Sequence, residues 1–299
     1  MKTKAVKGNW SLRTNKFGLP SVFLFCIFFF LAGFFVSTLF SHSQEHEYDL
    51  RLMARPRARL LEKSTKEQTE YDLLQTGDSG DDFITLIPFQ VLSWYPRALY
   101  FPNFASTEQC ERIVDMAKRG LKPSTLALRK GETEENTKGI RTSSGVFISA
   151  SEDKTGVLDA IEEKIAKATK IPSTHGEAFN ILRYEVGQRY NSHYDAFNPT
   201  EYGPQKSQRL ASFLLYLTDV PEGGKTMFPF ENGLNMDGSY GYEDCIGLRV
   251  RPRKGDGLLF YSLFPNGTID PTSLHGSCPV LKGEKWVATK WIRDQVQND

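Results

Sequence analysis

The sequence predicts an α+β protein: a jelly-roll core with supporting helices on its N-terminal side, preceded by one transmembrane helix. Three observations predict this class. An uncharged apolar run fills residues 21–40, two amphipathic helical patterns occupy 106–121 and 157–171, and short strand-like segments separated by glycine- and proline-containing turns follow from about residue 178. Helices followed by many short strands are typical of an antiparallel barrel or jelly roll buttressed by helices.

The apolar run has the length of a membrane span, because about twenty residues at about 1.5 Å each cross the roughly 30 Å hydrocarbon core. A cleaved signal peptide usually has a shorter apolar stretch, and a buried core helix would show a polar face. Basic residues precede the run, namely Lys2, Lys4, Lys7, Arg13 and Lys16. The positive-inside bias therefore predicts a cytosolic tail over 1–20, a signal anchor over 21–40 and a lumenal remainder.

Residues 41–84 are charged and too poor in apolar side chains to specify a core, so they are expected to form a lumenal stem. The folded domain is expected over 85–299. With 299 residues and 39% hydrophobic content, the chain can bury one sizeable core. Its formal net charge of +1 argues against a general nucleic-acid binder, which needs a clear basic excess.

Each helical pattern has an apolar face. In the first, Ser106 is a candidate N-cap and Cys110 and Ile113 belong to the buried side. The second pattern is VLDAIEEKIAKATKI, residues 157–171. The strand-like segments are residues 178–186, 209–220, 247–252, 255–263 and 285–294. These strands form the scaffold on which the candidate site is placed.

A histidine and a carboxylate stand close together in QRYNSHYDAF, and the chain has only five histidines. In an extended strand His193 and Asp195 point to the same face. With a second histidine from elsewhere they would form the facial triad of non-haem Fe(II) enzymes. His275, which lies between two predicted strands, is the candidate. The alternative is that the pair makes ordinary surface or structural hydrogen bonds.

Lys285 follows His275 by ten positions, on a strand whose alternation places Lys285, Val287, Thr289 and Trp291 on one face. A lysine directed into a barrel should find a carboxylate, because an unpaired buried ammonium is costly. The alternative is that Lys285 faces solvent while Trp286 faces the core.

Four segments, LRYEVGQRYNSHYD, RLASFLLYLTDVPEGGKTMFP, PRKGDGLLFYSL and HGSCPVLKGEKWVATKWI, resemble the catalytic core of the plant-type prolyl 4-hydroxylases. The resemblance runs from about Val91 to Arg293 and implies a double-stranded β-helix, the jelly roll of Fe(II)/2-oxoglutarate-dependent dioxygenases. It implies that His193, Asp195 and His275 bind the iron and that Lys285 binds the far carboxylate of 2-oxoglutarate.

The resemblance extends less specifically to other positions. Tyr184 and Thr226 are similar to residues that help to hold the cosubstrate, and Tyr190, Arg209 and Trp291 to residues beside the peptide channel. All five have ordinary packing roles as their alternative. The charged stretch 124–145 is similar to a loop that closes over peptide, or is a solvated insertion. One departure is Lys225, where the family usually has an acidic residue.

The implied reaction is hydroxylation of peptidyl proline to 4-hydroxyproline in proline-rich secretory or cell-wall proteins, coupled to oxidative decarboxylation of 2-oxoglutarate to succinate and CO2. It requires Fe(II), 2-oxoglutarate and O2, with L-ascorbate to recover oxidised iron. A polyproline II segment suits an aromatic groove, because its extended conformation is already ordered. The alternatives are another 2-oxoglutarate oxygenase, such as a lysyl hydroxylase, or a non-catalytic membrane-tethered jelly roll that binds polyproline.

The protein is therefore expected to be a single-pass type II membrane protein of the endoplasmic reticulum or the Golgi, with its catalytic domain in the lumen. Cys110, Cys245 and Cys278 would then lie in an oxidising compartment. A Cys245–Cys278 disulfide is favoured because both flank late strands near His275, although spacing alone does not fix the connectivity. The sequon at Asn266 is a candidate glycosylation site in a turn-like segment. Nothing in the sequence specifies the oligomeric state.

Overall fold

A computed structural model describes residues 27, 29 and 86–297, and the last of these ranges lies within one compact unit, Gln75–Asp299. No helix in the described part of the chain has the length and apolar character to cross a membrane. The predicted tail 1–20, anchor 21–40 apart from Ile27 and Phe29, and stem 41–84 lie outside the described residues.

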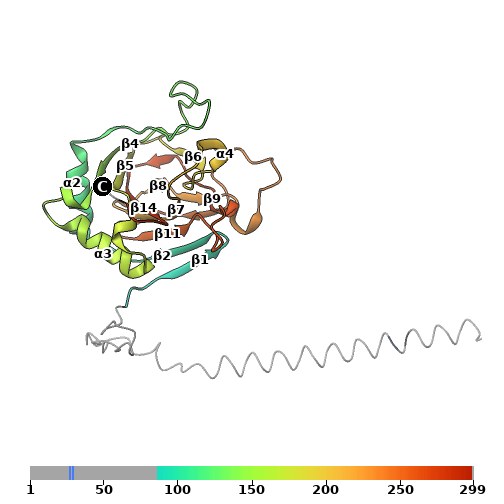
Figure 1. Cartoon of the computed structure of the whole chain (residues 1–299), viewed down its shortest axis with the longest axis horizontal. Helices are drawn as coiled ribbons and strands as arrows, with labels where there is room; N and C mark the ends of the chain where they lie inside the picture. Colours follow the sequence, from blue (N-terminus) through green and yellow to red (C-terminus); the bar gives the residue numbers. More distant parts are fainter. Residues whose placement is uncertain (1–26, 28, 30–85, 298–299) are drawn as a thin grey trace, which may run out of the picture. The chain divides into compact units, whose positions relative to one another are not determined.

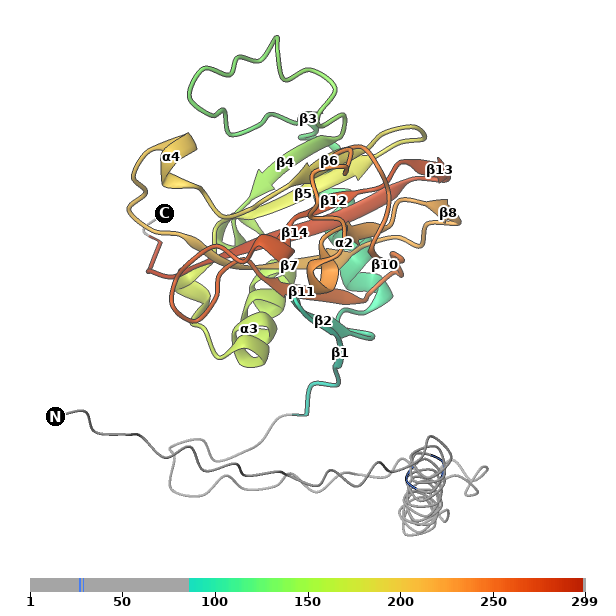
Figure 2. The same ribbon diagram turned by 90° about the vertical axis from the view of Figure 1, so that its right-hand side faces the viewer.

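Two antiparallel sheets form the centre of the domain (Figures 1 and 2). The larger, eight-stranded sheet has the order β1 (Gln90–Trp94), β2 (Arg97–Phe101), β11 (Gly257–Tyr261), β7 (Arg209–Tyr216), β14 (Lys285–Arg293), β5 (Phe179–Tyr184), β4 (Ser144–Ile148) and β3 (Lys122–Pro123). The smaller has the order β10 (Leu248–Val250), β9 (Thr226–Phe228), β12 (His275–Ser277) and β6 (Tyr190–His193). A separate pair joins β13 (Val280–Lys282) to β8 (Glu222–Gly223).

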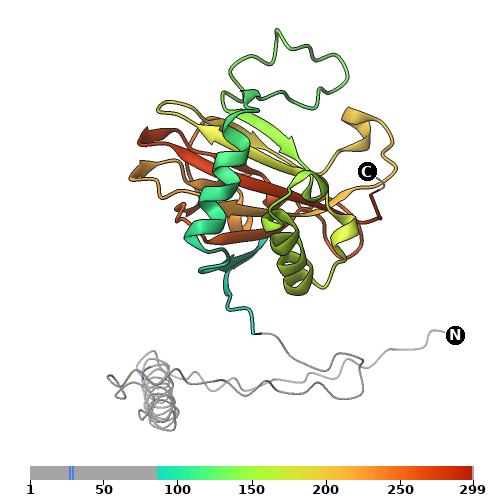
Figure 3. The same ribbon diagram turned by 90° about the vertical axis from the view of Figure 1, so that its left-hand side faces the viewer.

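Two helices cover one face of the larger sheet, as Figure 3 shows. They are α2 (Thr107–Lys118) and α3 (Val157–Thr169), so both predicted helices are confirmed. The Ser106 side chain accepts a hydrogen bond from the Gln109 backbone and completes a capping box, as its position predicts. Shorter helical turns are α4 (Pro199–Tyr202), η2 (Ala150–Glu152), η3 (Ser173–His175), η4 (Glu231–Gly233) and η5 (Pro271–Ser273).

The central strands of the larger sheet, β11, β7, β14 and β5, are buried on both faces, and the alternation of their side chains divides the core in two. Toward the helices lie Cys110, Ile113, Ala117, Leu158, Ile161, Ile165, Phe179, Ile181, Ala211, Phe213, Leu215, Trp286, Ala288 and Ile292. Between the two sheets lie Leu182, Tyr184, Leu214, Tyr216, Phe228, Val250, Leu258, Phe260 and Val287. The predicted jelly-roll core with helices outside it is therefore confirmed.

Candidate active site

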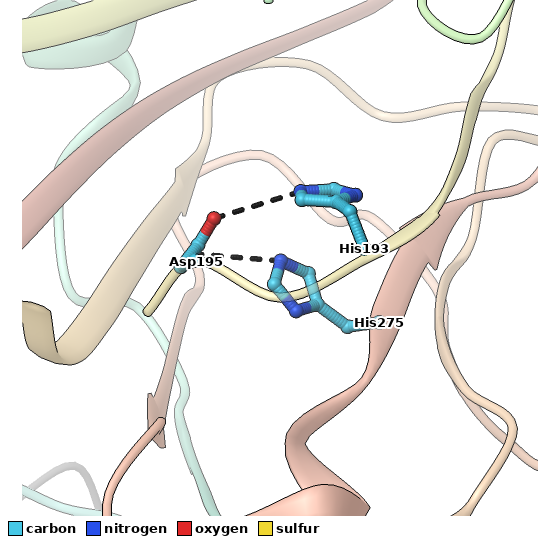
Figure 4. Close-up of side chains that lie close together, drawn as sticks. All are labelled: His193, Asp195 and His275. Carbon is cyan, nitrogen blue, oxygen red and sulfur yellow. Dashed lines mark ion pairs between the residues drawn. The ribbon is translucent and has the colours of Figure 1, made fainter. Parts of the chain in front are cut away.

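Three side chains come together at the β12–β6 strand pair of the smaller sheet. The antiparallel pairing of β12 with β6 puts His275 opposite His193, with ring centroids 4.4 Å apart. Nε2 of His193 lies 3.5 Å from Oδ1 of Asp195, and Nε2 of His275 lies 3.5 Å from Oδ2 of the same carboxylate (Figure 4). One feature differs from the prediction: β6 ends at His193, so Asp195 belongs to the bend that follows and not to the strand.

Backbone carbonyls fix the orientation of both imidazoles. Nδ1 of His193 donates to the Asn191 carbonyl at 2.9 Å, and Nδ1 of His275 donates to the Ser273 carbonyl at 3.0 Å. With the proton on Nδ1, each ring presents the lone pair of Nε2 toward the carboxylate. In many metal sites a hydrogen bond from one ring nitrogen of a histidine leaves the other nitrogen to bind the metal. Here Nε2 of each ring is left for that role.

The protonation states also suit a divalent cation. Burial lowers the pKa of His275 to about 4, so that the ring is neutral near pH 7. Burial alone would raise the pKa of Asp195, but His275, His193 and Arg209 together lower it below its usual value. A neutral His275 imidazole and an ionised Asp195 carboxylate, with His193 as the second imidazole, make up the donor set that holds Fe(II) and leaves other coordination positions open.

The geometry fits the iron that the sequence predicts. One potential ligand atom from each of His193, Asp195 and His275 lies within 4.8 Å of the others, and in the described part of the chain this is the one group of its kind. Convergence of three donors from β6, the bend after it and β12 allows a single ion to bind all three. The three residues predicted as ligands are thus brought together.

Lys285 lies on the same face of β14 as the residues between the sheets and is only 2% exposed. Its ammonium donates to Oγ of Ser277 at 2.9 Å, and no carboxylate among the described residues forms an ion pair with it. Burial lowers its pKa to about 7. The expected buried orientation is confirmed, but the carboxylate partner is not supplied by the described protein. An added carboxylate would satisfy this group.

Tyr184 lies beside that ammonium, and Thr226 lies opposite its hydrogen-bond acceptor Ser277 in the neighbouring strand. Tyr184 is in register with Lys285 across the β5–β14 pair, and Lys285 Nζ lies 5.4 Å from the centre of its ring. Thr226 is in register with Ser277 and accepts a hydrogen bond from the Tyr216 hydroxyl at 2.8 Å. Tyr184, Thr226 and Lys285 are each 2% exposed. The structure therefore gathers hydroxyls and one cation into a buried polar site suited to a small carboxylic acid.

A cavity of about 890 Å³ adjoins two of the three candidate ligands, His193 and Asp195. Tyr190, Arg209 and Trp291 line it, together with residues of the predicted loop such as Leu126 and Arg141. The Tyr190 ring stacks on His193 with centroids 3.6 Å apart. The three residues predicted for the peptide channel therefore share one cavity with the candidate iron site, and an aromatic wall of this kind suits a proline-rich segment.

The guanidinium of Arg209 is more fully engaged than the sequence suggests. Nε and Nη2 each donate to Glu177 at 2.7 Å, and the group lies 3.6 Å above the Trp291 ring. Glu177 also accepts from Arg293, and the two arginines hold its pKa below its usual value although burial opposes this. Sequence reasoning missed Glu177, because no spacing links a residue before β5 with β7 and β14.

The remaining predicted positions lie apart from the donors. The Cys245–Cys278 disulfide is confirmed, and Cys110 is a buried free thiol. Asn266 is exposed in a turn, where its side-chain oxygen accepts a hydrogen bond from the Thr268 hydroxyl at 2.7 Å. The carbonyl of Lys225 accepts a backbone hydrogen bond from Cys278.

Comparison with known proteins places this geometry in a class. Residues 179–293 match the family model of the 2OG-Fe(II) oxygenase superfamily. The match spans the segment from β5 to the end of β14 and contains all three candidate metal ligands and Lys285. The class uses Fe(II), 2-oxoglutarate and O2, and the donors described above fit the first two.

Two curated relatives from Arabidopsis thaliana match almost the whole chain. Probable prolyl 4-hydroxylase 9 is 65% identical over 97% of this chain and 98% of its own length. Prolyl 4-hydroxylase 13 is 55% identical over 95% of this chain and 97% of its own length. The chain belongs to the prolyl 4-hydroxylase family. Among solved structures, the viral collagen prolyl hydroxylase vCPH from Paramecium Bursaria Chlorella virus-1 is 24% identical, covers 66% of this chain and 95% of that chain, and has a TM-score of 0.48.

Proposed function

We propose that this protein hydroxylates peptidyl proline at C4 in proline-rich polypeptides and couples that reaction to decarboxylation of 2-oxoglutarate. One observation carries the proposal: a buried ammonium, without a carboxylate partner among the described residues, lies beside a two-histidine, one-carboxylate cluster that opens onto an aromatic cavity. A small dicarboxylic acid satisfies the ammonium, and a polyproline segment suits the cavity. The family membership supports the same reaction.

The residues divide the work among binding, orientation and exclusion of water. His193, Asp195 and His275 hold Fe(II), which together with 2-oxoglutarate supplies the oxidising chemistry when bound. Lys285 neutralises the far carboxylate of the cosubstrate, with the hydroxyls of Tyr184 and Thr226 alongside. Burial of these groups strengthens the charge pair, because water does not screen it.

The peptide lies in the cavity, whose lining includes Tyr190 and Trp291. His193 covers one face of the Tyr190 ring, and Arg209 covers one face of the Trp291 ring. Glu177 occupies two donors of Arg209 and holds the guanidinium flat over Trp291. The remaining amino group is available for a peptide carbonyl. None of these contacts requires a charged side chain on the substrate residue near the iron. The arrangement therefore favours proline over lysine as the residue modified.

Turnover by the purified protein tests the reaction. Succinate formation with Fe(II), 2-oxoglutarate and ascorbate should rise when a poly-proline peptide is added, and the peptide should gain 4-hydroxyproline. Hydroxylysine from a lysine-containing peptide would instead identify a lysyl hydroxylase. Peptide binding without succinate would identify a non-catalytic binding module.

Membrane attachment and compartment are also proposals, and they rest on the sequence. The apolar run 21–40 after a basic tail supports a type II anchor in the endoplasmic reticulum or Golgi, with the catalytic part lumenal. The exposed sequon at Asn266 supports glycosylation there. Protease added to sealed microsomes should spare residues after about 41, and Asn266→Gln should remove a glycan. Digestion of the catalytic part in intact vesicles would show that the protein has the opposite topology.

A further inference from the structure

Asp195 is held less firmly by its own backbone than the two histidines are by theirs. His193 and His275 lie on paired strands, whereas Asp195 follows the end of β6 in a bend. Its carboxylate nevertheless has to keep a fixed plane, because metal affinity depends on the direction of each ligand atom. A contact from outside the bend is therefore needed to orient this group.

Ser212 supplies that contact. Its hydroxyl donates to Oδ2 of Asp195 at 2.5 Å, a length typical of a hydroxyl bonded to an ionised carboxylate. The direction of the bond is fixed, since an ionised carboxylate only accepts. Ser212 is 0% exposed, so bulk solvent does not reach its hydroxyl.

The position of Ser212 makes it a rigid support. It lies on β7, between β11 and β14 in the middle of the larger sheet, and is in register with Phe260 on one side and Trp291 on the other. The bond thus joins the loosely held ligand to one of the central strands of the fold. It also occupies Oδ2, the oxygen nearer His275, and leaves Oδ1 with no hydroxyl donor among the described residues.

We infer that Ser212 is a positioning residue for the metal centre, which fixes the plane of the Asp195 carboxylate and reserves Oδ1 as the metal-binding oxygen. The inference rests on the proposed function only through the metal site. Removal of an outer contact of this kind typically lowers metal affinity about 10- to 100-fold. Ser212 is not itself among the residues that line the peptide cavity, and among the described contacts no hydrogen bond joins it to Lys285.

Mn(II) binding to the full-length, metal-free protein tests this without requiring turnover. Ser212→Ala should raise the Kd for Mn(II) by about tenfold or more. Ser212→Thr, which keeps the hydroxyl, should bind more tightly than Ser212→Ala. A matched control is Ser262→Ala, because Ser262 is a similarly buried serine whose hydroxyl has no hydrogen-bond partner in the structure. That variant should bind Mn(II) as the wild type does.

The outcomes separate the two proposals. If the wild type itself binds no Mn(II), the metal site and the proposed function both fail. If the wild type binds and Ser212→Ala binds equally well, the role of Ser212 alone is overturned. Thermal unfolding of each metal-free variant is measured alongside, and if Ser212→Ala does not unfold cooperatively, Ser212→Cys, of similar volume but with a weak donor, replaces it. Equal affinity in that variant overturns the inference in the same way.

Discussion

Two buried lysines on one strand show how differently the two faces of the larger sheet are built. Lys290 points toward the helices, is 4% exposed and pairs with Glu162 of α3. Lys285 points between the sheets, is 2% exposed and has Ser277 as its hydrogen-bond acceptor. The first charge is neutralised within the protein, whereas the second is left for a ligand.

The same contrast extends along both faces. The helix-facing side is almost wholly apolar. The other side carries buried polar groups among its apolar residues, namely Asn180, Ser212, Lys285 and Thr289. From the smaller sheet, Thr226 and Ser277 hydrogen-bond to residues of that side. Because an unsatisfied buried polar group costs stability, such groups persist where a function requires them. One face of the sheet is thus built for stability and the other for binding.

The largest effect is expected at the metal ligands. His275→Ala should reduce iron-dependent succinate formation to background, because two of the three donors do not hold Fe(II) in the required arrangement. The fold should persist, since the substitution removes a polar ring from β12 of the smaller sheet and not a residue of the helix-facing core. Wild-type rates in this variant would remove the facial-triad assignment. Circular dichroism of the metal-free variant checks the fold.

Lys285→Met is expected to raise the KM for 2-oxoglutarate at least tenfold, because loss of one partner from a desolvated charge pair costs about 2 to 5 kcal/mol. The Kd for Mn(II) should stay unchanged, since the lysine is not a ligand. Steady-state kinetics with varied cosubstrate and varied peptide distinguish the two binding sites. An unchanged KM for 2-oxoglutarate would show that Lys285 does not bind it.

Lys290→Met is the matched substitution on the helix-facing side of the larger sheet. It should leave the KM for 2-oxoglutarate unchanged and lower the free energy of unfolding by about 3 kcal/mol. The reason is that it leaves the largely buried Glu162 carboxylate without its partner. Denaturant unfolding measures the loss, and the Lys290→Met, Glu162→Leu double variant should recover most of it. If Lys290→Met instead raised the KM, the division between the two faces would be wrong.

The pH dependence of stability provides a subtler test. The pKa of Lys285 is lowered to about 7 in the folded protein, against about 10.4 in an unfolded chain. Between these values the unfolded state binds more protons, so this group makes stability rise with pH from about 7, and its full penalty is present below 7. The Tm difference between wild type and Lys285→Met should therefore shrink from pH 6.5 to 9.5. Parallel curves would contradict the lowered pKa.

The smallest effect is expected at Tyr184. Tyr184→Phe removes one neutral hydroxyl from the cosubstrate site, which corresponds to about 1 kcal/mol and about a fivefold rise in the KM for 2-oxoglutarate. The ring remains and continues to pack beside Lys285. The KM for peptide, measured in the same assay, serves as the control. A rise confined to the peptide KM would move Tyr184 out of the cosubstrate site.

Much of the site follows from local patterns in the sequence. Alternation along residues 285–291 predicts that Lys285 and Trp291 share a face, and the structure confirms it. The choice between an inward Lys285 and an inward Trp286 was a false one, because the sheet is covered on both sides and both residues are buried. Periodicity reports which side chains share a face, but not what covers that face.

Other features depend on segments far apart in the chain, and only the tertiary structure decides them. The pairing of β12 with β6 sets His275 opposite His193, and Asp195 reaches the same point from a bend that the strand pattern does not predict. The contacts of Glu177 with Arg209, and of Ser212 with Asp195, join residues whose separation in sequence carries no signal. The sequence by itself determined the types of donor and the face of β14 that Lys285 occupies, because these follow from residue chemistry and the twofold period of a strand. Strand register and the contacts that orient each donor were decided by packing, because they depend on which distant strands lie side by side.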